Sequence, residues 1–431
     1  MQRIGVIGAG HVGLVNAAVF ADLGNKVICQ DSDRRKIQRL QKCIIPIFEP
    51  GLKELVKKNI KAKRLSFTSS LPEVVKKSLI IFICVGTPPR GDGSVDLSSV
   101  KNVACKIAKN MKEYKIIVEK STVPVETGEW IRRTISNYNQ RKIEFSIASN
   151  PEFLREGSAI KDAFRPDRVI LGVEDKKAEK IMRALFKPIR APILITNIKT
   201  AEIIKHASNS FLANKISFIN AVAQICDKVG ADVAKVSEGM GLDKRIGRVF
   251  LDAGCGFGGF CFPKDLEAFI YIAKKAGYDF GLLKEVTKIN EGQKYLLVKK
   301  IEAAICVIRG KTIGVLGLSF KPNTDDIRFS VSIDVIRMLQ KEGARIKAYD
   351  PQAMLKAKEE LEGIRFCQSP YEVARNSDCL LILTGWNEFR QLELARIKRL
   401  LRQPIIVDGR NIFEPKEMNK LGFIYKCIGR G

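Results

Sequence analysis

Short apolar runs alternate along the chain with longer segments that mix apolar and polar residues. The runs contain few polar positions, which is typical of strands covered by helices on both faces of a parallel sheet. Helices are expected between them, for example at residues 14–23 and 330–342. The pattern therefore predicts the α/β class with two doubly wound parallel sheets. Strands are predicted at residues 3–7, 26–30, 79–85, 115–118, 145–148, 312–316, 344–349, 379–384 and 404–407.

One long helical pattern separates the two sets of strands. It runs from residue 200 to residue 229, with no proline and no glycine before Gly230. Such a helix is long enough to join two domains and to supply a dimer interface. We therefore expect an N-terminal domain at residues 1–198, a central helical domain at 199–309 and a C-terminal domain at 310–431. Lys205 and Asn209 share one helix face, a pair that is most often merely solvated.

The first predicted strand ends in a glycine-rich turn, Gly8-Ala9-Gly10-His11-Val12-Gly13. With the following helix and second strand, this is a Rossmann-type dinucleotide fingerprint in its expected context. Gly8 permits a tight turn, Gly10 lets the backbone approach a pyrophosphate, and Gly13 lets the helix pack on the strand. Asp31 lies 23 residues beyond Gly8, where a carboxylate can accept both ribose hydroxyls and repels a 2′-phosphate. NAD is thus favoured over NADP.

A second glycine-rich stretch, residues 254–265, contains a candidate nucleophile. Four glycines precede Cys261, and Pro263 follows it, so a helix is expected to begin there. A helix N-terminus favours a thiolate. Asp265 lies one turn further on. A lone cysteine is usually a small buried apolar residue, but this setting favours a reactive one.

The composition argues against several classes of protein. The net charge is +27, yet the basic residues are scattered and no nucleic-acid motif accompanies them, so no nucleic-acid partner is predicted. Eleven cysteines without a CxxC pair and only two histidines argue against a metal site and favour free thiols in the cytoplasm. No apolar run approaches the length of a membrane span.

Eight motifs, taken together and in order, resemble the UDP-glucose 6-dehydrogenases of the UDP-glucose/GDP-mannose dehydrogenase family. The resemblance covers essentially the whole chain. The motifs are GAGHVG at 8–13, VGTP at 85–88, KSTVP at 120–124, NPEFLREG at 150–157, KHASNSFLANKISFIN at 205–220, GCGFGGFCFPKD at 254–265, GLSFKPNTDDIR at 317–328 and DGRN at 408–411.

The resemblance implies an NAD-dependent, four-electron oxidation of UDP-glucose at C6 to UDP-glucuronate. A cysteine thiohemiacetal and then a thioester carry the second oxidation. A UDP-sugar substrate and a homodimer or higher homo-oligomer are also implied. The alternatives are a dehydrogenase of UDP-N-acetylglucosamine or UDP-galactose and a non-catalytic basic binder.

Site roles follow from the matched positions. Pro151 is expected to begin a helix with Glu152 and Glu156 on one face. Phe260 departs from the serine that the family usually has before the nucleophile. The implied catalytic residues are Cys261, Lys205, Asn209, Asp265, Thr122 and Glu152. The implied cofactor contacts are Gly8, Gly10, His11, Val12, Gly13, Asp31, Lys36, Thr87, Thr122, Glu156, Lys264 and Arg328. The implied substrate contacts are Glu152, Phe153, Leu154, Lys205, Asn209, Arg245, Phe257, Gly258, Lys321 and Arg410.

Overall fold

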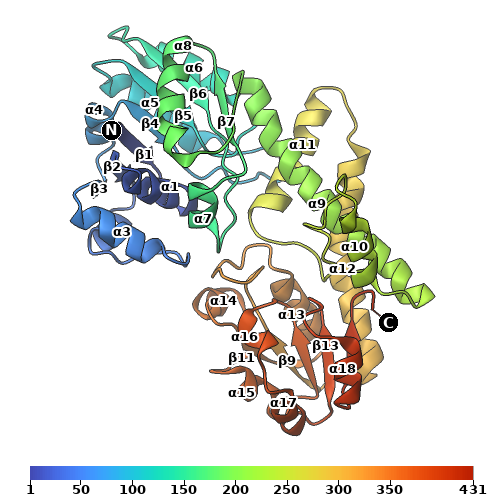
Figure 1. Ribbon diagram of the computed structural model, residues 1–431. Coiled ribbons are helices and arrows are strands. Elements are labelled where there is room, and N and C mark those ends of the chain that lie inside the picture. Colours follow the sequence, from blue (N-terminus) through green and yellow to red (C-terminus); the bar gives the residue numbers. More distant parts are fainter. Residues whose placement is uncertain (431) are drawn as a thin grey trace. The chain divides into compact units, whose positions relative to one another are not determined.

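The computed structural model describes residues 1–430 as two compact units (Figure 1). The N-terminal unit comprises Met1–Ser208 and Glu267–Tyr278, and the C-terminal unit comprises Asn209–Leu266 and residues 279–430. The boundary passes through two helices, so each of them contributes residues to both units.

The described part of the N-terminal unit contains one eight-stranded sheet in the order β3-β2-β1-β4-β5-β6-β7-β8. Neighbouring strands are parallel except β6 and β7, which pair antiparallel. The prediction of a parallel sheet is therefore correct apart from this one pair. The strands are β1 (Arg3–Ile7), β2 (Lys26–Gln30), β3 (Leu65–Thr68), β4 (Ile80–Ile83), β5 (Lys115–Glu119), β6 (Phe145–Ser149), β7 (Val169–Val173) and β8 (Ile193–Thr196).

Helices cover both faces of this sheet, because its strand residues are apolar on both sides. Ile80 and Phe82 of β4 pack in a core with α1, α2, α3, α7 and α8, whereas Ile81 and Ile83 pack in another core with α4, α5 and α6. This alternation is the period of two that a strand imposes. The helices are α1 (His11–Asp22), α2 (Arg34–Gln41), α3 (Leu52–Lys61), α4 (Leu71–Lys77), α5 (Ser98–Asn110), α6 (Thr127–Tyr138), α7 (Ala159–Phe164), α8 (Lys176–Phe186) and the short 3₁₀ helix η1 (Lys187–Ile189).

The long predicted helix is α9, which spans 32 residues. The unit boundary falls between Ser208 and Asn209 within it. A second boundary falls within α11, after Leu266. The helices of this middle part of the chain are α9 (Ile198–Val229), α10 (Val233–Leu242), α11 (Cys261–Lys275) and α12 (Gly281–Ile305).

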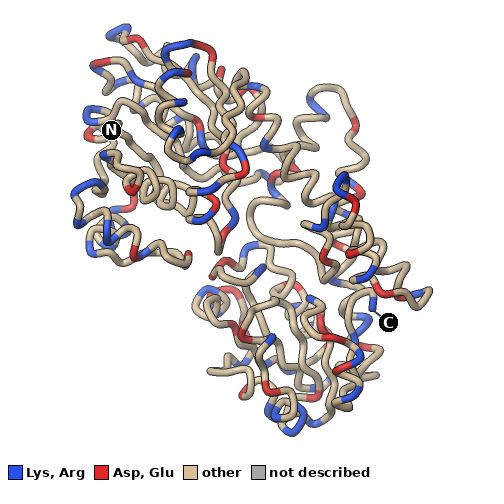
Figure 2. The backbone as a smooth tube through the Cα atoms, viewed as in Figure 1, with Lys and Arg blue, Asp and Glu red and all other residues tan. Residues whose placement is uncertain are grey.

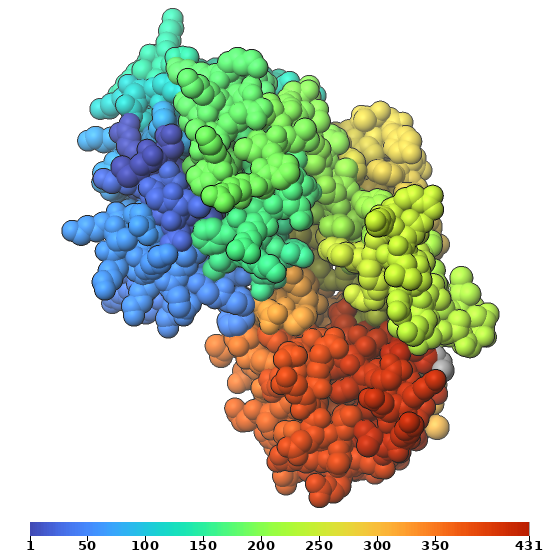
Figure 3. All heavy atoms as spheres, viewed as in Figure 1, coloured from blue at the N-terminus to red at the C-terminus, as the bar shows by residue number. Residues whose placement is uncertain are grey.

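The second predicted sheet has six parallel strands among the described residues, in the order β11-β10-β9-β12-β13-β14. The residues of this part of the chain are coloured orange to red in Figure 3. The strands are β9 (Thr312–Leu316), β10 (Arg345–Tyr349), β11 (Arg365–Phe366), β12 (Cys379–Ile382), β13 (Ile405–Asp408) and β14 (Ile424–Cys427). The helices are α13 (Val331–Lys341), α14 (Met354–Glu360), α15 (Pro370–Ala374), α16 (Asn387–Arg390), α17 (Leu394–Leu400) and α18 (Pro415–Lys420).

Two features of the described chain bear on its class. None of its helices is long and apolar enough to cross a membrane. Lysine and arginine are spread over both units rather than gathered in one stripe (Figure 2). The scattered charge that the sequence predicts is therefore seen in three dimensions.

Candidate active site

The glycine turn between β1 and α1 has the shape of a dinucleotide cradle. Gly8 has φ +103°, and a Cβ there would lie 2.5 Å from the carbonyl oxygen of Cys84. A Cβ on Gly13 would lie 1.8 Å from the carbonyl oxygen of Gly8. At Gly10 an added Cβ meets no atom within 4 Å, so the space beside the helix start is open. No side chain caps α1, and its first N–H groups can therefore bind a phosphate.

Asp31, directly after β2, is held by three donors. Its Oδ2 accepts from Ala9 N at 3.0 Å and from Lys36 Nζ at 2.9 Å, and its Oδ1 accepts from Asp33 N at 3.0 Å. Burial raises the pKa of Asp31, but these hydrogen bonds outweigh it and leave the pKa below its ordinary value. The group is thus a fixed carboxylate, which suits ribose hydroxyls and disfavours a 2′-phosphate.

The loops after β4 and β5 meet at the carboxyl edge of the same sheet. Thr87 donates its hydroxyl to the carbonyl oxygen of Thr122 at 2.9 Å. Next to them Lys120 is buried and donates to Asn150 Oδ1 at 2.8 Å. Burial lowers the pKa of Lys120 to about 8. Ligands bind at this edge in open α/β sheets.

The loop after β6 carries the predicted base, Glu152, and α9 carries its partner, Lys205. Lys205 Nζ lies 3.2 Å from Glu152 Oε1, and both side chains are buried. The expected helix from Pro151 is absent, because residues 151–157 form an irregular turn. Glu152 Oε2 accepts from Leu154 N at 2.7 Å, and Gly157 has φ +79°. Glu152 and Glu156 therefore do not share a helix face.

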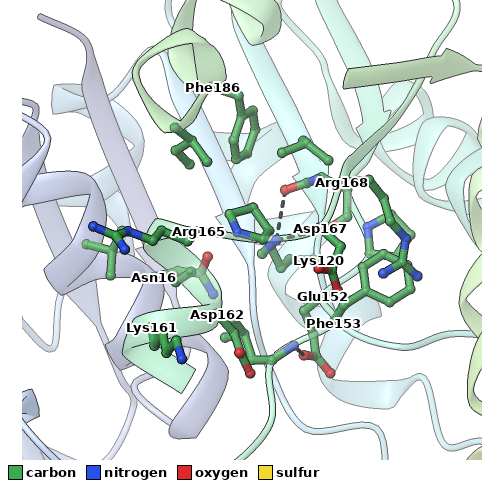
Figure 4. Close-up of a pocket in the computed structure, with 18 of the residues that line it drawn as sticks. Asn16, Lys120, Glu152, Phe153, Lys161, Asp162, Arg165, Asp167, Arg168 and Phe186 are labelled. Atoms are coloured by element: carbon green, nitrogen blue, oxygen red, sulfur yellow. Dashed lines mark hydrogen bonds between the residues drawn. The ribbon is translucent and has the colours of Figure 1, made fainter. Parts of the chain in front are cut away.

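This loop borders a cavity of about 310 Å³ in the N-terminal unit (Figure 4). Glu152, Phe153 and Arg168 lie together on one side of it in Figure 4, opposite Arg165. The Arg168 guanidinium stands 3.9 Å from the centre of the Phe153 ring, and Lys205 Nζ stands 5.2 Å from it. Phe153, which is predicted to contact substrate, is thus fixed by cation–π contacts.

In the C-terminal unit, Cys261 is the first residue of α11 and is half-buried. The predicted helix start is therefore correct. Asp265 follows one turn later, where its Oδ2 accepts from Asn209 Nδ2 at 2.6 Å and its Oδ1 lies 2.7 Å from Lys264 Nζ. Lys264 and Asp265 are almost fully buried. The thiol thus stands at a helix start beside a firmly held carboxylate.

Side chains from other segments form hydrogen bonds with the backbone of the glycine loop before Cys261. Asn290 accepts from Phe257 N at 2.8 Å and donates to Phe257 O at 3.0 Å. Arg410 donates to the carbonyl oxygen of Gly256 at 2.9 Å. These bonds give the loop one conformation and connect it to the DGRN turn after β13.

A second cavity, of about 440 Å³, lies in the C-terminal unit. Its lining is basic and includes Lys321 and Arg410 from the predicted set, with Arg248, Arg390 and Arg430. Arginine and lysine suit a pyrophosphate. Arg245 does not line this cavity; it is an exposed side chain that pairs with Asp243 at 2.6 Å.

Family models match all three parts of the chain, and known proteins match its full length. Models of the UDP-glucose/GDP-mannose dehydrogenase family match residues 2–190 (NAD binding domain), 199–292 (central domain) and 314–415 (UDP binding domain). UDP-glucose 6-dehydrogenase TuaD of Bacillus subtilis is 49% identical over 100% of this chain and 94% of its own. UDP-glucose 6-dehydrogenase of Rhizobium meliloti is 47% identical, with both chains fully covered.

The chain belongs to the UDP-glucose/GDP-mannose dehydrogenase family. A solved UDP-glucose dehydrogenase from the hyperthermophilic archaeon Pyrobaculum islandicum superimposes with a TM-score of 0.93 at 39% identity, covering 99% of this chain and 97% of that one. A UDP-D-ManNAc dehydrogenase from Pyrococcus horikoshii gives a TM-score of 0.88 at 28% identity, with both chains fully covered. The N-terminal sheet is thus the family's NAD-binding domain, and its open glycine cradle and ionised Asp31 fit that cofactor.

The family's UDP binding domain differs from its NAD-binding domain in the loop after the first strand. The next helix, α13, begins at Val331, 15 residues after the end of β9, whereas α1 begins at His11, four residues after the end of β1. Asp350, which follows β10 as Asp31 follows β2, accepts from Leu318 N and Ser319 N, and also from Trp386 Nε1. This second sheet therefore lacks the glycine turn that leads directly into a helix in the dinucleotide fingerprint.

Sequence reasoning missed one buried carboxylate, Glu49. Its Oε2 accepts from His11 Nε2 at 2.8 Å and from Gly157 N at 2.7 Å, and its Oε1 accepts from Ala159 N at 2.8 Å. It thus joins the fingerprint to the loop that carries Glu152. Burial lowers the pKa of His11, but the hydrogen bond to Glu49 and the negative charges of Glu156, Glu49 and Glu152 together outweigh it, and the pKa is raised. The sequence Glu49-Pro50-Gly51 carries no signal of these contacts.

Proposed function

We propose that the protein oxidises UDP-glucose at C6 to UDP-glucuronate in two successive hydride transfers to NAD. The observation that carries the proposal is Cys261 at the start of α11 with Asp265 held beside it. A single alcohol oxidation needs no nucleophile, whereas oxidation of an aldehyde needs a tetrahedral adduct that can release hydride. Full-length relatives named UDP-glucose 6-dehydrogenase support the same substrate.

In the proposed sequence, the alcohol at C6 first loses a proton and a hydride and becomes an aldehyde. The Cys261 thiolate then adds to the carbonyl carbon and forms a thiohemiacetal. Loss of a second hydride converts this adduct into a thioester. Water attacks the thioester carbon and gives up its two protons, the C–S bond breaks, and the carboxylate and the thiolate are released. NAD, which the glycine turn and Asp31 would hold, would supply the hydride acceptor, and two NAD would be consumed for each sugar.

The other residues supply charge and proton transfer. The ammonium of Lys205 and the amide of Asn209 would stabilise the developing oxyanion at C6, a contribution of several kcal/mol in many enzymes. Asp265 and Thr122 would position the hydrolytic water. Glu152, already paired with Lys205 at 3.2 Å, would act as its base. This pair keeps a proton acceptor next to a cation in a buried setting.

Binding roles follow the matched motifs. Substrate would be held by Phe153, Leu154, Phe257, Gly258, Lys321, Arg410 and Arg245. The cofactor would be held by the glycine turn with His11 and Val12, by Asp31, Lys36, Thr87, Thr122 and Glu156, and by Lys264 and Arg328. The basic cavity that Lys321 and Arg410 line supports the diphosphate part of this assignment.

We also propose a homodimer or higher homo-oligomer that works in the cytoplasm. Phe211, Phe218 and Ile225 repeat every seven residues along α9, and each is at least half exposed. Such an apolar stripe on a helix is typical of an interface. Sedimentation of the wild type and of Phe218→Glu tests this point, since the charge should dissociate the assembly.

Turnover on a panel of UDP-sugars tests the substrate. NADH formation is followed by absorbance with UDP-glucose, UDP-galactose and UDP-N-acetylglucosamine at equal concentrations. The proposal expects kcat/KM for UDP-glucose to exceed both others by at least ten-fold. A higher value for either of the others would reject UDP-glucose as the substrate. Absence of NADH with all three would reject the proposed activity.

A further inference from the structure

The residue before the nucleophile is Phe260, where the glycine loop becomes α11. The two glycines before it touch the segment after β9 directly. A Cβ on Gly258 would lie 2.1 Å from the carbonyl oxygen of Phe329, and a Cβ on Gly259 would lie 2.5 Å from the Phe320 ring. Positions 258 and 259 therefore have no room for a side chain, and the next residue, Phe260, does carry one.

That side chain stands against two cations of the same unit. The Arg328 guanidinium lies 4.3 Å from the centre of the Phe260 ring, and Lys264 Nζ lies 5.6 Å from it. Both distances are within the range of a cation–π interaction. The backbone strengthens the connection, because Gly259 N donates to Arg328 O at 3.0 Å. The ring thus links the nucleophile loop to Arg328.

The guanidinium of Arg328 is held at its edge as well as on its face. Its Nε lies 3.0 Å from Asp326 Oδ1 and 2.9 Å from Asp326 Oδ2. Burial raises the pKa of Asp326, but the hydrogen bonds from Arg328 and the positive charges of Arg328 and Lys356 together outweigh it, so the pKa is lowered and the carboxylate stays charged. Nη2 of Arg328 also donates to Asp326 Oδ2 at 2.5 Å, so the carboxylate holds this edge as a bidentate fork. The ring of Phe260 adds a contact on the face of the guanidinium.

We infer that Phe260 is a positioning residue that fixes the Arg328 guanidinium, and with it Lys264, for binding of NAD. The inference rests on one part of the proposed function, the binding of NAD by both cations. Preorganising a charged side chain lowers the ordering cost of binding an anionic ligand. A serine at this position has no ring and could not hold a guanidinium by its face. The bulky residue before Cys261 therefore serves cofactor affinity.

Calorimetric titration of NAD, without sugar, tests the inference on Phe260→Tyr and Phe260→Leu. Tyrosine keeps the aromatic face and should bind NAD within two-fold of the wild type. Leucine keeps an apolar side chain without a π system and should weaken NAD binding about five-fold, the effect of a moderate cation–π contact. Equal affinities of the two variants would overturn the inference, because packing alone would then explain the residue.

A double-mutant cycle shows whether Phe260 acts through Arg328. In an Arg328→Gln background, Phe260→Leu should weaken NAD binding two-fold or less. A full five-fold loss in that background would overturn the link to Arg328. Because binding is measured without sugar, it is independent of the reaction. If NAD affinity follows the ring while no UDP-sugar is oxidised, the proposed function fails and the inference stands.

Discussion

Glu49→Gln is the substitution whose cost the structure specifies best. The glutamine keeps the shape of the side chain, and its oxygen can replace Oε2, which accepts from His11 and Gly157. Its NH₂ group then faces the N–H of Ala159, the first residue of α7. Two donors facing each other in a buried site cost about 1–3 kcal/mol. Loss of charge-assisted bonds adds to this, so we expect a loss of about 2–4 kcal/mol.

The stability cost of Glu49→Gln should also depend on pH, in a direction that the pKa of His11 determines. The pKa of His11 is raised above 6.5 in the fold, so its pairing with Glu49 contributes stability that is complete below pH 6.5. That contribution is lost as the pH rises through the raised pKa. The cost of Glu49→Gln should therefore be larger at pH 6 than at pH 9.

Thermal unfolding of the wild type and the variant at both pH values measures the effect. For a unit of about 200 residues, each kcal/mol lowers Tm by roughly 2–4 °C. The matched control is Glu54→Gln, an exposed carboxylate on the neighbouring α3, which should change Tm by less than about 2 °C. Equal shifts for the two variants, or a larger Glu49→Gln shift at pH 9, would refute the reasoning.

Three further substitutions test other parts of the account. Cys261→Ser should abolish formation of the acid while leaving the Kd for NAD unchanged; near-normal turnover would reject the thioester scheme. Gly13→Ala should weaken NAD binding at least ten-fold in a calorimetric titration, because its Cβ would lie 1.8 Å from a carbonyl oxygen; Gly239→Ala, with open space around it, is the control. Burial raises the pKa of Glu202 to about 7, so the wild type should lose up to about 3 kcal/mol between pH 4.5 and pH 8. Melting curves at the two pH values should show a weaker dependence in Glu202→Gln, and an unchanged dependence would reject this assignment.

Most of the fold could be predicted because its strands are short, apolar and separated by clear helical patterns. β1, β2 and β9 have the predicted bounds, and α9 begins two residues before the predicted start. The antiparallel pairing of β7 with β6 could not be read from composition, since a buried strand is apolar in either direction. The direction of a strand relative to its neighbour depends on the path of the chain that connects them.

The local structure of the candidate site was predictable where glycine and proline determine the backbone. The glycine turn and the helix start at Cys261 are set by glycine and proline within a few residues. The loop after Pro151 was predicted wrongly, because Glu152 and Glu49 bind its amides and replace the helical hydrogen bonds. Contacts between residues more than 100 positions apart, such as Glu49 with Gly157, leave no periodic signal in the sequence.

The ratio of NADH formed to UDP-glucose consumed tests the central claim most directly. The assay uses limiting UDP-glucose with excess NAD, and absorbance is followed to completion. The account predicts a ratio near two, because both hydrides leave the same carbon before the Cys261 thioester is hydrolysed. A ratio near one would show that oxidation stops at the aldehyde and would contradict a catalytic role for Cys261.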